Sequence, residues 1–313
     1  MNYKLKKISG DASFREFYRL QKGKNTSIII QAKKEKFKNL ITYIVVNKIL
    51  AKYKIYAPKL ITNHYEHDII EITDLGQKSF YNTIIKKKNK FNDYKDLIKI
   101  IIKLQNIKLQ RNYRLGKFKI NFQNYSIKNL HKESDLFFDW YLKYCFKSPN
   151  LKKIKNIFKK ELTKIYKKLY FQNDTFVHRD FHVSNLMYLN NKIGVIDGQD
   201  ALIGNQAYDL ASLIDDVRFK TSNKFKEKVY NYYLKTNKKI KLKKFSIDFE
   251  ILSVLRNLKI IGIFMRLAER DNKKKYLKLI PYAWQMIDYR ANKNKVFDNL
   301  IFLLKKNFPK FLS

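Results

Sequence analysis

Hydrophobic and polar positions near the start of the chain follow the pattern of β-strands. Residues 11–20 and 27–32 both favour extended structure, and the segment between them, Lys22-Gly23-Lys24-Asn25, favours a turn. Two strand-like runs joined by a short turn that contains glycine predict a β-hairpin. We therefore expect the chain to begin with an antiparallel sheet.

The next 45 residues predict one helix followed by two more strands. Residues 36–53 carry apolar side chains at helical spacing, and Pro58 then interrupts the chain. Residues 59–63 and 68–73 are short extended runs. They lead into Asp74-Leu75-Gly76, where glycine allows the chain to change direction. We therefore expect this tripeptide to connect the strands to the part of the chain beyond residue 76.

Beyond residue 76 the pattern becomes mainly helical. Four segments carry apolar residues at helical spacing: residues 97–107, 154–169, 245–268 and 297–304. A β-like island lies among them, in which Thr175-Phe176-Val177 and residues 185–189 are extended and Asn190-Asn191 turns the chain into residues 193–196.

A small β-rich lobe joined to a helical lobe is the plan of a two-lobed kinase. We therefore expect an α+β, protein-kinase-like fold with a nucleotide-binding lobe at residues 1–75. Residues 76–313 would form a helical lobe that carries the catalytic loop and the acceptor site. A chain of 313 residues is long enough to bury the cores of two such lobes.

The formal charge of +40 would normally indicate a polyanionic partner. The basic residues are mostly lysine, however, and they are spread along the whole chain. Ile, Asn, Tyr and Phe are abundant, whereas Gly numbers 8 and Pro 4. Codons rich in A and T produce this composition, so we favour base composition over a functional polyanion surface as its cause. No nucleic-acid-binding module is recognisable, and we expect no specific nucleic-acid partner.

Other features of the sequence favour a cytoplasmic protein. Its apolar runs are far shorter than the roughly 20 residues that cross a bilayer. No export signal is apparent at the N-terminus. Cys145 is the only cysteine and cannot form an internal disulfide. We expect neither export nor a membrane partner.

Candidate chemistry is concentrated in His178-Arg179-Asp180, followed by Asn185 and Asp197. Phosphoryl transfer requires an aligned acceptor hydroxyl, magnesium on the phosphates and neutralisation of developing charge. Asp180 can accept or orient the hydroxyl proton, while Asn185 and Asp197 supply the hard oxygen ligands that suit Mg²⁺. The three residues fall in order on a loop, a strand, a turn, a strand and a second loop. This combination predicts a phosphotransferase.

Each of these residues also has a purely structural interpretation. Asp180 could bond backbone amides, Asn185 could bond locally within a turn, and Asp197 could open a turn before glycine. The three together favour the catalytic interpretation. His178 and His182 are four residues apart, but they lack the intervening glutamate of the zinc-protease helix motif. We therefore expect His178 to be buried and to support the loop.

Asp209 lies in Ala207-Tyr208-Asp209-Leu210-Ala211, where a helical stripe begins. An acidic residue near a helix start often serves only as a cap or as a partner of the helix dipole. The alternative is that Asp209 bonds the backbone of the catalytic loop and holds its shape. The sequence leaves these two roles open.

These motifs resemble the aminoglycoside phosphotransferase and choline kinase superfamily, whose catalytic motif is His-x-Asp followed by Asn and a later Asp. Within it, the likeness is greatest to bacterial anomeric kinases of N-acetylmuramate and N-acetylglucosamine. Five segments carry it, in order along nearly the whole chain: residues 10–19, 178–187, 195–201, 208–213 and 256–264.

The resemblance implies roles for individual residues. Asp180 would be the catalytic base, Asn185 and Asp197 the magnesium ligands, and residues 74–76 the hinge beside adenine. The segment that covers the nucleotide phosphates would comprise Gly10, Asp11, Ala12, Ser13, Phe14 and Arg15. ATP and Mg²⁺ would be required. The product would be a sugar 1-phosphate used in the recycling of cell-wall sugars.

Three positions depart from the family pattern. Gly198 stands where Phe usually follows the metal-binding Asp, which would loosen the packing of that loop. Gly10 is the only glycine in its loop, so the loop is not a Gly-x-Gly-x-x-Gly phosphate cradle. Gln31 stands where many kinases place the phosphate-pairing lysine. The basic residues left as alternatives for that role are Lys33, Lys34, Arg15 and Arg19.

Recognition of the acceptor rests on fewer residues. His182 and Asp200 flank the catalytic residues and could bind sugar hydroxyls or an N-acetyl group. Arg256 could pair with a lactyl carboxylate, since guanidinium matches carboxylate geometry. An ordinary surface position or an intramolecular ion pair is the alternative for Arg256.

Two other functions compete with an amino-sugar kinase. A kinase of aminoglycosides, choline or another small alcohol is the first, but cationic acceptors favour an acidic cleft, and 27 acidic against 67 basic residues give little sign of one. A pseudoenzyme or a basic nucleic-acid-binding protein that kept the kinase-like fold is the second. The intact Asp180, Asn185 and Asp197 argue against a pseudoenzyme, and the lack of a recognisable nucleic-acid-binding module argues against the nucleic-acid-binding protein.

Overall fold

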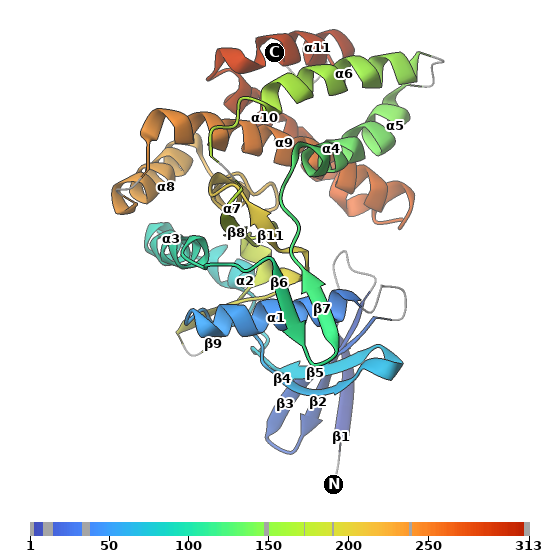
Figure 1. Ribbon diagram of the computed structural model, residues 1–313, viewed down its shortest axis with the longest axis vertical. Helices are drawn as coiled ribbons and strands as arrows, with labels where there is room; N and C mark the ends of the chain where they lie inside the picture. The colour runs from blue at the N-terminus through green and yellow to red at the C-terminus, as the bar shows by residue number, and fades with distance from the viewer. Residues whose placement is uncertain are drawn as a thin grey trace. The chain divides into compact units, whose positions relative to one another are not determined.

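The computed structural model describes residues 3–8, 15–32, 38–146, 150–171, 173–189, 191–237 and 240–309 (Figure 1). The chain divides into two compact units. The first contains Met1–Gln123 and His178–Leu202, and the second contains Asn124–Val177 and Ile203–Ser313. The lobe boundary predicted after residue 75 stays a prediction, because the compact units group residues 76–123 and the catalytic segment with the N-terminal sheet.

A five-stranded antiparallel sheet forms the base of the first unit. Its strands, in spatial order, are β1 (Tyr3–Ile8), β2 (Glu16–Lys22), β3 (Asn25–Gln31), β5 (Ile69–Thr73) and β4 (Leu60–His64). The predicted hairpin is confirmed in β2 and β3, which pair through Phe17 and Ile30 around a turn in which Gly23 has a φ of 59°. The part of that prediction at residues 11–14 lies outside the described residues.

Helix α1 (Lys38–Lys52) packs on this sheet and confirms the predicted helix (Figure 1). Its Leu40, Tyr43 and Ile44 share a buried cluster with side chains from β3 and β5. The residues that these strands and their ends contribute are Ile30, Ala32, Ile70 and Ile72. The alternation of apolar residues along the strands therefore selects the face that α1 covers.

A short turn of helix, η1 (Tyr65–His67), lies between β4 and β5, and the remainder of the first unit follows β5. Its elements are α2 (Phe80–Ile84), α3 (Phe91–Gln105), β6 (Asn112–Leu115), β7 (Phe118–Asn121), η3 (Val183–Asn185), β9 (Leu186–Leu189), β10 (Lys192–Val195) and η4 (Gly198–Asp200). Helix α3 confirms the helix predicted from residues 97–107. The β6–β7 hairpin was not predicted; its turn holds Gly116 at a φ of 56°, a signal that the sequence did contain.

Helices dominate the second unit. They are α4 (Ile127–Leu136), the π-helical segment η2 (Phe137–Leu142), α5 (Lys143–Cys145), α6 (Leu151–Tyr166), α7 (Ala207–Ile214), α8 (Asn223–Thr236), α9 (Leu242–Glu269), η5 (Lys274–Leu279), α10 (Ile280–Ala291), η6 (Lys295–Phe297) and α11 (Asp298–Asn307). The helices predicted around residues 154–169, 245–268 and 297–304 are confirmed, although α6 ends three residues early. Two short strands, β8 (Thr175–Val177) and β11 (Leu202–Gly204), pair with each other.

Helix α9 is the core of the second unit. It is buried over most of its circumference, and α4, η2, α7 and α10 pack around it. A helix surrounded in this way must be apolar or carry paired polar groups on all sides. Ser253 of α9 illustrates the second case, because its Oγ donates to Asp215 Oδ2, at the end of α7, at 2.7 Å. Arg290 of α10 binds the same carboxylate through two nitrogens at 2.8 and 3.1 Å. Burial alone would raise the pKa of Asp215, but Arg290 and Lys226 lower it to about 2.

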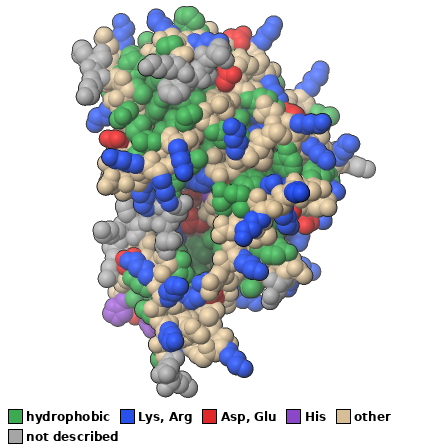
Figure 2. Space-filling view, turned by 180° about the vertical axis from the view of Figure 1, so that it is seen from behind, with side chains coloured by type: hydrophobic (Ala, Val, Ile, Leu, Met, Phe, Trp, Pro, Cys, Tyr) green, Lys and Arg blue, Asp and Glu red, His purple; other side chains and the backbone are tan. Residues whose placement is uncertain are grey.

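Lysine and arginine side chains are scattered over the face shown in Figure 2, among apolar and neutral ones. This distribution agrees with the even spread of lysine along the sequence. Within the described part of the chain, no helix is both long and apolar enough to span a membrane.

The backbones of α9 and α4 approach each other closely at Gly262, so a substitution there is expected to destabilise the protein. A Cβ on Gly262 of α9 would lie 2.2 Å from the carbonyl carbon of Leu136, at the end of α4. Backbone atoms cannot move aside as a flexible side chain can, so we expect Gly262→Ala to lower the free energy of unfolding by about 3 kcal/mol or more. Urea denaturation measures this loss. Lys243→Ala, on an exposed turn of the same helix, is the matched control, and equal stability of both variants would contradict the prediction.

Candidate active site

The segment from residue 178 to 185 is a closed loop with a buried start. His178 is fully buried, and its ring meets that of Phe181 edge-on at a centroid distance of 6.2 Å. Arg179 has a φ of 73°, a left-handed conformation that non-glycine residues adopt at an energetic cost. The predicted burial of His178 is confirmed; its support of the loop remains a prediction.

Two hydrogen bonds to one carbonyl oxygen close this loop around Asp180. The backbone N–H of His182 donates to the Asp180 carbonyl at 3.0 Å, and Asn185 Nδ2 donates to the same oxygen at 3.1 Å. Asn185 is therefore held by the residue whose carboxylate is the predicted base. Its Oδ1 is left as an acceptor.

The β9–β10 hairpin brings Asp197 next to Asn185. Leu186 pairs with Val195, so Asn185 comes opposite Ile196, and the N–H of Ile196 donates to the Asn185 carbonyl at 3.2 Å. Asp197 is the next residue. The predicted hairpin thus brings the backbone of Asn185 close to that of Asp197.

Asp197 is held by a buried arginine. Arg15 Nη2 lies 2.9 Å from Asp197 Oδ1, and Arg15 Nη1 lies 3.1 Å from Gln199 Oε1. The Arg15 side chain is only 3% exposed, whereas that of Asp197 is 36% exposed. Asp197 itself has a φ of 69°. Its carboxylate is therefore fixed from one side and open to solvent at the same time.

Aromatic rings enclose the arginine. The Arg15 guanidinium carbon lies 5.8 Å from the centre of the Phe17 ring and 6.0 Å from that of the Tyr43 ring, a cation–π arrangement. Burial, with a smaller contribution from the nearby Asp197 carboxylate, raises the pKa of Tyr43 to about 12. The Tyr43 hydroxyl is therefore neutral at physiological pH and adds no charge beside Asp197.

A second arginine holds the connector after β5. Arg19 Nε and Nη2 bind the two carboxylate oxygens of Asp74 at 2.6 and 3.1 Å, and Nη2 also reaches the Gly76 carbonyl at 2.9 Å. The N–H of Gly76, which has a φ of 85°, donates to Asp74 Oδ1 at 2.8 Å. Burial tends to raise the pKa of Asp74, but the bonds from Arg19 lower it below its usual value. Sequence reasoning missed this pair.

Arg15 and Arg19 were both candidates to replace the phosphate-pairing lysine, and the structure shows that they bind different partners. Arg19 is bound to the connector at Asp74, whereas Arg15 is bound to the metal-ligand candidate Asp197. Gln31 lies in β3 opposite Glu16. Lys33 and Lys34 lie outside the described residues.

The oxygens at Asn185 and Asp197 fit a magnesium ion. Asn185 offers Oδ1, and Asp197 offers Oδ2 because Oδ1 is taken by Arg15. Amide and carboxylate oxygens are hard ligands, and Mg²⁺ is usually held by one or two protein carboxylates together with water and phosphate. Among the described residues there is no group of three or more His, Cys, Asp or Glu that could hold a metal ion.

The other predicted site residues are distributed over both units. In the first, His182 is buried within the loop, and Asp200 is exposed with Oδ1 4.0 Å from Arg179 Nη1. In the second, Asp209 is buried in the first turn of α7, and its role toward the loop remains a prediction. Gly10 to Phe14 lie outside the described residues.

The alternative of a surface position for Arg256 is wrong, because the residue is only 2% exposed. Within the described part of the chain, its Nε and Nη1 have no hydrogen-bond partner. Its role in binding a substrate remains a prediction.

A model of the phosphotransferase enzyme family matches residues 4–242 of the chain. The chain belongs to this family. It is an enzyme that transfers phosphoryl groups to small molecules, as the catalytic motif predicted.

Curated relatives of this phosphotransferase carry a narrower name. The N-acetylmuramate/N-acetylglucosamine kinase of Neisseria meningitidis is 27% identical over 286 residues, which cover 90% of this chain and 83% of that protein. The protein of the same name from Pseudomonas aeruginosa is 26% identical, covering 90% of this chain and 81% of its own.

The fold of the phosphotransferase also matches solved structures. The ADP-bound aminoglycoside phosphotransferase APH(2'')-Ib superposes with a TM-score of 0.60 at 17% identity, covering 90% of this chain and 92% of that one. The predicted α+β, kinase-like fold is confirmed: an antiparallel N-terminal sheet with its helix precedes a mainly helical part.

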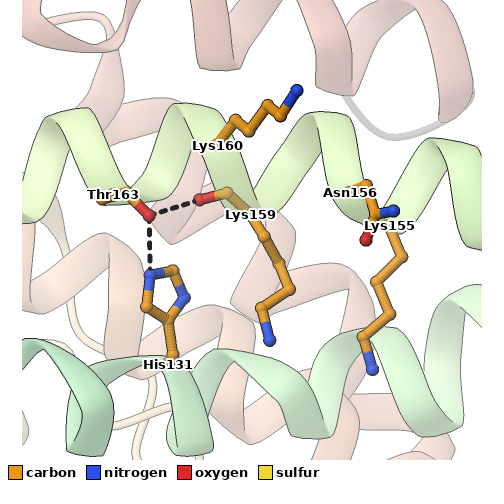
Figure 3. A pocket seen from close by; sticks show the side chains of 6 residues that line it. All are labelled: His131, Lys155, Asn156, Lys159, Lys160 and Thr163. Atoms are coloured by element: carbon orange, nitrogen blue, oxygen red, sulfur yellow. Dashed lines mark hydrogen bonds between the residues drawn. The ribbon is translucent and has the colours of Figure 1, made fainter.

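A pocket of about 380 Å³ in the second unit of the phosphotransferase is lined by other residues (Figure 3). They are His131, Lys155, Asn156, Lys159, Lys160 and Thr163, from α4 and α6. His131 Nε2 lies 2.8 Å from Thr163 Oγ1, and Lys159 pairs with Asp135. Burial and the charge of Lys159 lower the pKa of His131. No predicted site residue lines this pocket, and we assign it no part in the reaction.

Substitution of Gly198 can show how tightly the segment after Asp197 is packed. The expectation that Gly198 loosens this segment is wrong, because α1 closes on it: a Cβ there would lie 2.7 Å from Val46 Cγ1 and 3.5 Å from His178 Nε2. We expect Gly198→Ala to destabilise the protein by about 1–3 kcal/mol in urea denaturation. Val46→Ala removes the clashing methyl, so the double variant should lose less stability than the sum of the two single changes. Strict additivity would contradict this account.

Proposed function

We propose that this phosphotransferase transfers the γ-phosphoryl group of ATP to the anomeric hydroxyl of N-acetylmuramate or N-acetylglucosamine. One observation carries the proposal of phosphoryl transfer: hydrogen bonds join Asp180 to Asn185, and Asn185 to the residue before Asp197. The names of the relatives from N. meningitidis and P. aeruginosa support the choice of acceptor. The ADP in the structure of APH(2'')-Ib supports an adenine nucleotide as donor.

Asp180 would act as the general base. Its carboxylate would accept the proton of the anomeric hydroxyl while the sugar oxygen forms a bond to the γ-phosphorus. The bond between that phosphorus and the oxygen bridging to the β-phosphate then breaks, and ADP leaves with the electron pair. A hemiacetal hydroxyl is more acidic than an ordinary alcohol, so a carboxylate of ordinary basicity suffices.

The residues around Asp180 would hold the donor. Magnesium, when bound, neutralises charge on the phosphate oxygens, and Asn185 Oδ1 and Asp197 Oδ2 would hold it. Residues 10–15 would cover the phosphates. Arg15 immediately precedes Glu16, which pairs with Gln31, so it can place a cation near the position of the missing lysine. Its contact with Asp197 supports this assignment.

The product would be a sugar 1-phosphate. Its formation from free wall-derived amino sugars would serve cell-wall recycling in the cytoplasm. His182 and Asp200, beside the catalytic loop, would bind hydroxyl or N-acetyl groups of the sugar.

The role of Asp180 is tested by Asp180→Asn, which keeps the size of the side chain but removes the base. We expect kcat to fall by about 10²- to 10⁴-fold. Binding of ADP with magnesium, measured by calorimetry, should stay within about threefold of wild type, because the ligands at Asn185 and Asp197 remain. Asp96→Asn removes an exposed carboxylate that pairs with Lys99 and is the control. An active Asp180→Asn enzyme would show that the base is elsewhere.

The acceptor is tested by ATP consumption with a panel of N-acetylmuramate, N-acetylglucosamine, choline and an aminoglycoside. We expect turnover only with the free reducing sugars, and none with their anomeric methyl glycosides, because methylation removes the attacking hydroxyl. Phosphate attached to the anomeric oxygen can be verified by ³¹P and ¹³C NMR. Turnover of choline or the aminoglycoside alone would contradict the proposal of a sugar acceptor, but it would agree with phosphoryl transfer.

A further inference from the structure

The negative charge of Asp197, the proposed metal ligand, is already matched by a cation of the protein. Arg15 Nη2 lies 2.9 Å from Asp197 Oδ1, so this oxygen is engaged and Oδ2 is the one left for a metal ion. The Asp197 side chain is 36% exposed, which keeps it within reach of a ligand. A guanidinium bound to a carboxylate offsets most of the charge that an approaching metal ion would meet. Asp197 therefore offers one oxygen and little net charge.

Arg15 is also held by side chains other than this carboxylate. Its Nη1 lies 3.1 Å from Gln199 Oε1, and the rings of Phe17 and Tyr43 enclose the guanidinium. Gln199 Nε2 in turn donates to Asp200 Oδ2 at 3.3 Å, so the carbonyl end of the Gln199 amide faces the arginine. With its side chain only 3% exposed, Arg15 is a fixed positive charge at the site.

Asn185, the other proposed ligand, adds one oxygen and no charge. Its Nδ2 donates to the Asp180 carbonyl at 3.1 Å, which leaves Oδ1 for a metal ion. The N–H of Ile196 donates to the Asn185 carbonyl at 3.2 Å and keeps Asn185 beside Asp197 in the backbone. Once Arg15 is counted, the two ligands together provide two oxygens and no net charge.

A pair of ligands without net charge suits one divalent ion better than two. Protein kinases hold two magnesium ions with an Asp and an Asn of this kind. Two divalent ions repel each other at short distance, so they need anionic protein ligands in addition to the nucleotide phosphates. In this protein a second ion would also meet the fixed charge of Arg15 beside Asp197.

We propose that Arg15 takes the place of a second metal ion at Asp197, so that the active site holds one divalent cation with each bound nucleotide. This inference rests on the proposed function, in which Asn185 and Asp197 hold the ion. An arginine is charged at every physiological pH and is part of the chain. It therefore supplies positive charge beside the metal ligand without a second ion having to bind.

The first test counts the ions bound by the wild-type enzyme. Mn²⁺ is the probe, because carboxylate and carbonyl oxygens suit it as they suit Mg²⁺ and its electron paramagnetic resonance signal distinguishes free from bound ion. Excess protein is mixed with a non-hydrolysable ATP analogue, so that all of the nucleotide is bound, and is titrated with Mn²⁺. We expect one ion for each bound nucleotide. Two ions would overturn the inference without any variant having to fold.

The second test repeats the count with variants of Arg15. In Arg15→Met the number of ions should rise to two, because the carboxylate of Asp197 is then left without a cation. In Arg15→Lys, which retains the charge, it should stay at one. Arg270→Met removes an exposed arginine that pairs with Asp271; it is the matched control and should also give one ion. A count of one in Arg15→Met would overturn the inference.

The dependence of kcat on magnesium separates this role from a structural one. When Mg²⁺ is raised from equimolar with ATP to a large excess, we expect kcat of Arg15→Met to rise about tenfold or more, because an added ion replaces the missing charge. Wild type should change by less than about twofold. An Arg15→Met defect that is equal at all magnesium concentrations would show a structural role and contradict the inference. If Arg15→Met does not fold, the wild-type and Arg15→Lys counts decide, and a second ion in either overturns the inference.

Failure of the proposed function would give a different pattern. The analogue needs no acceptor, so an enzyme that phosphorylates neither sugar would reject the acceptor and still yield an ion count. A nucleotide complex that binds no Mn²⁺ at all would reject the metal-binding roles of Asn185 and Asp197, and this inference with them.

Discussion

The ion pair between the buried Arg15 and the partly exposed Asp197 is the contact that fixes the predicted metal ligand of this phosphotransferase. It joins the residue before β2 to the residue after β10, which are far apart in the sequence. Because the arginine is enclosed by Phe17 and Tyr43 and almost out of reach of water, its attraction for the carboxylate is screened little. Asp197 is thereby held in a left-handed conformation with one oxygen engaged and the other open. On the next residue, Gly198, α1 approaches so closely that an added Cβ would lie 2.7 Å from Val46 Cγ1.

In the second unit, too, buried charged groups are stabilised by partners within the protein. Helix α9 is surrounded by other helices, so its polar residues have to find partners inside the protein. Asp215 forms ion pairs with Arg290 and Lys226 and accepts a hydrogen bond from Ser253. Glu133 forms an ion pair with Lys259 and accepts hydrogen bonds from two tyrosine hydroxyls.

Much of the secondary structure could be predicted from periodicity, because apolar side chains recur at helical spacing in α1, α3, α6, α9 and α11 and alternate along β2 and β3. The β6–β7 hairpin escaped prediction because its strands are only four residues long and lie in a helical stretch. The catalytic residues Asp180, Asn185 and Asp197 could be identified because chemistry restricts their types and a short hairpin restricts their spacing. The partners of Arg15 and Arg19 could not, since 67 basic residues offer too many equivalent candidates.

The sequence by itself determined the order and type of most elements and the residues able to move a phosphoryl group. Those are local properties, set by spacing along a helix, by alternation along a strand and by side-chain chemistry. Only the tertiary structure decided that Arg15 meets Asp197 and that Arg19 meets Asp74. Ion pairing depends on distance and burial in space, and two charges 182 residues apart in the chain leave no local pattern that could reveal their contact.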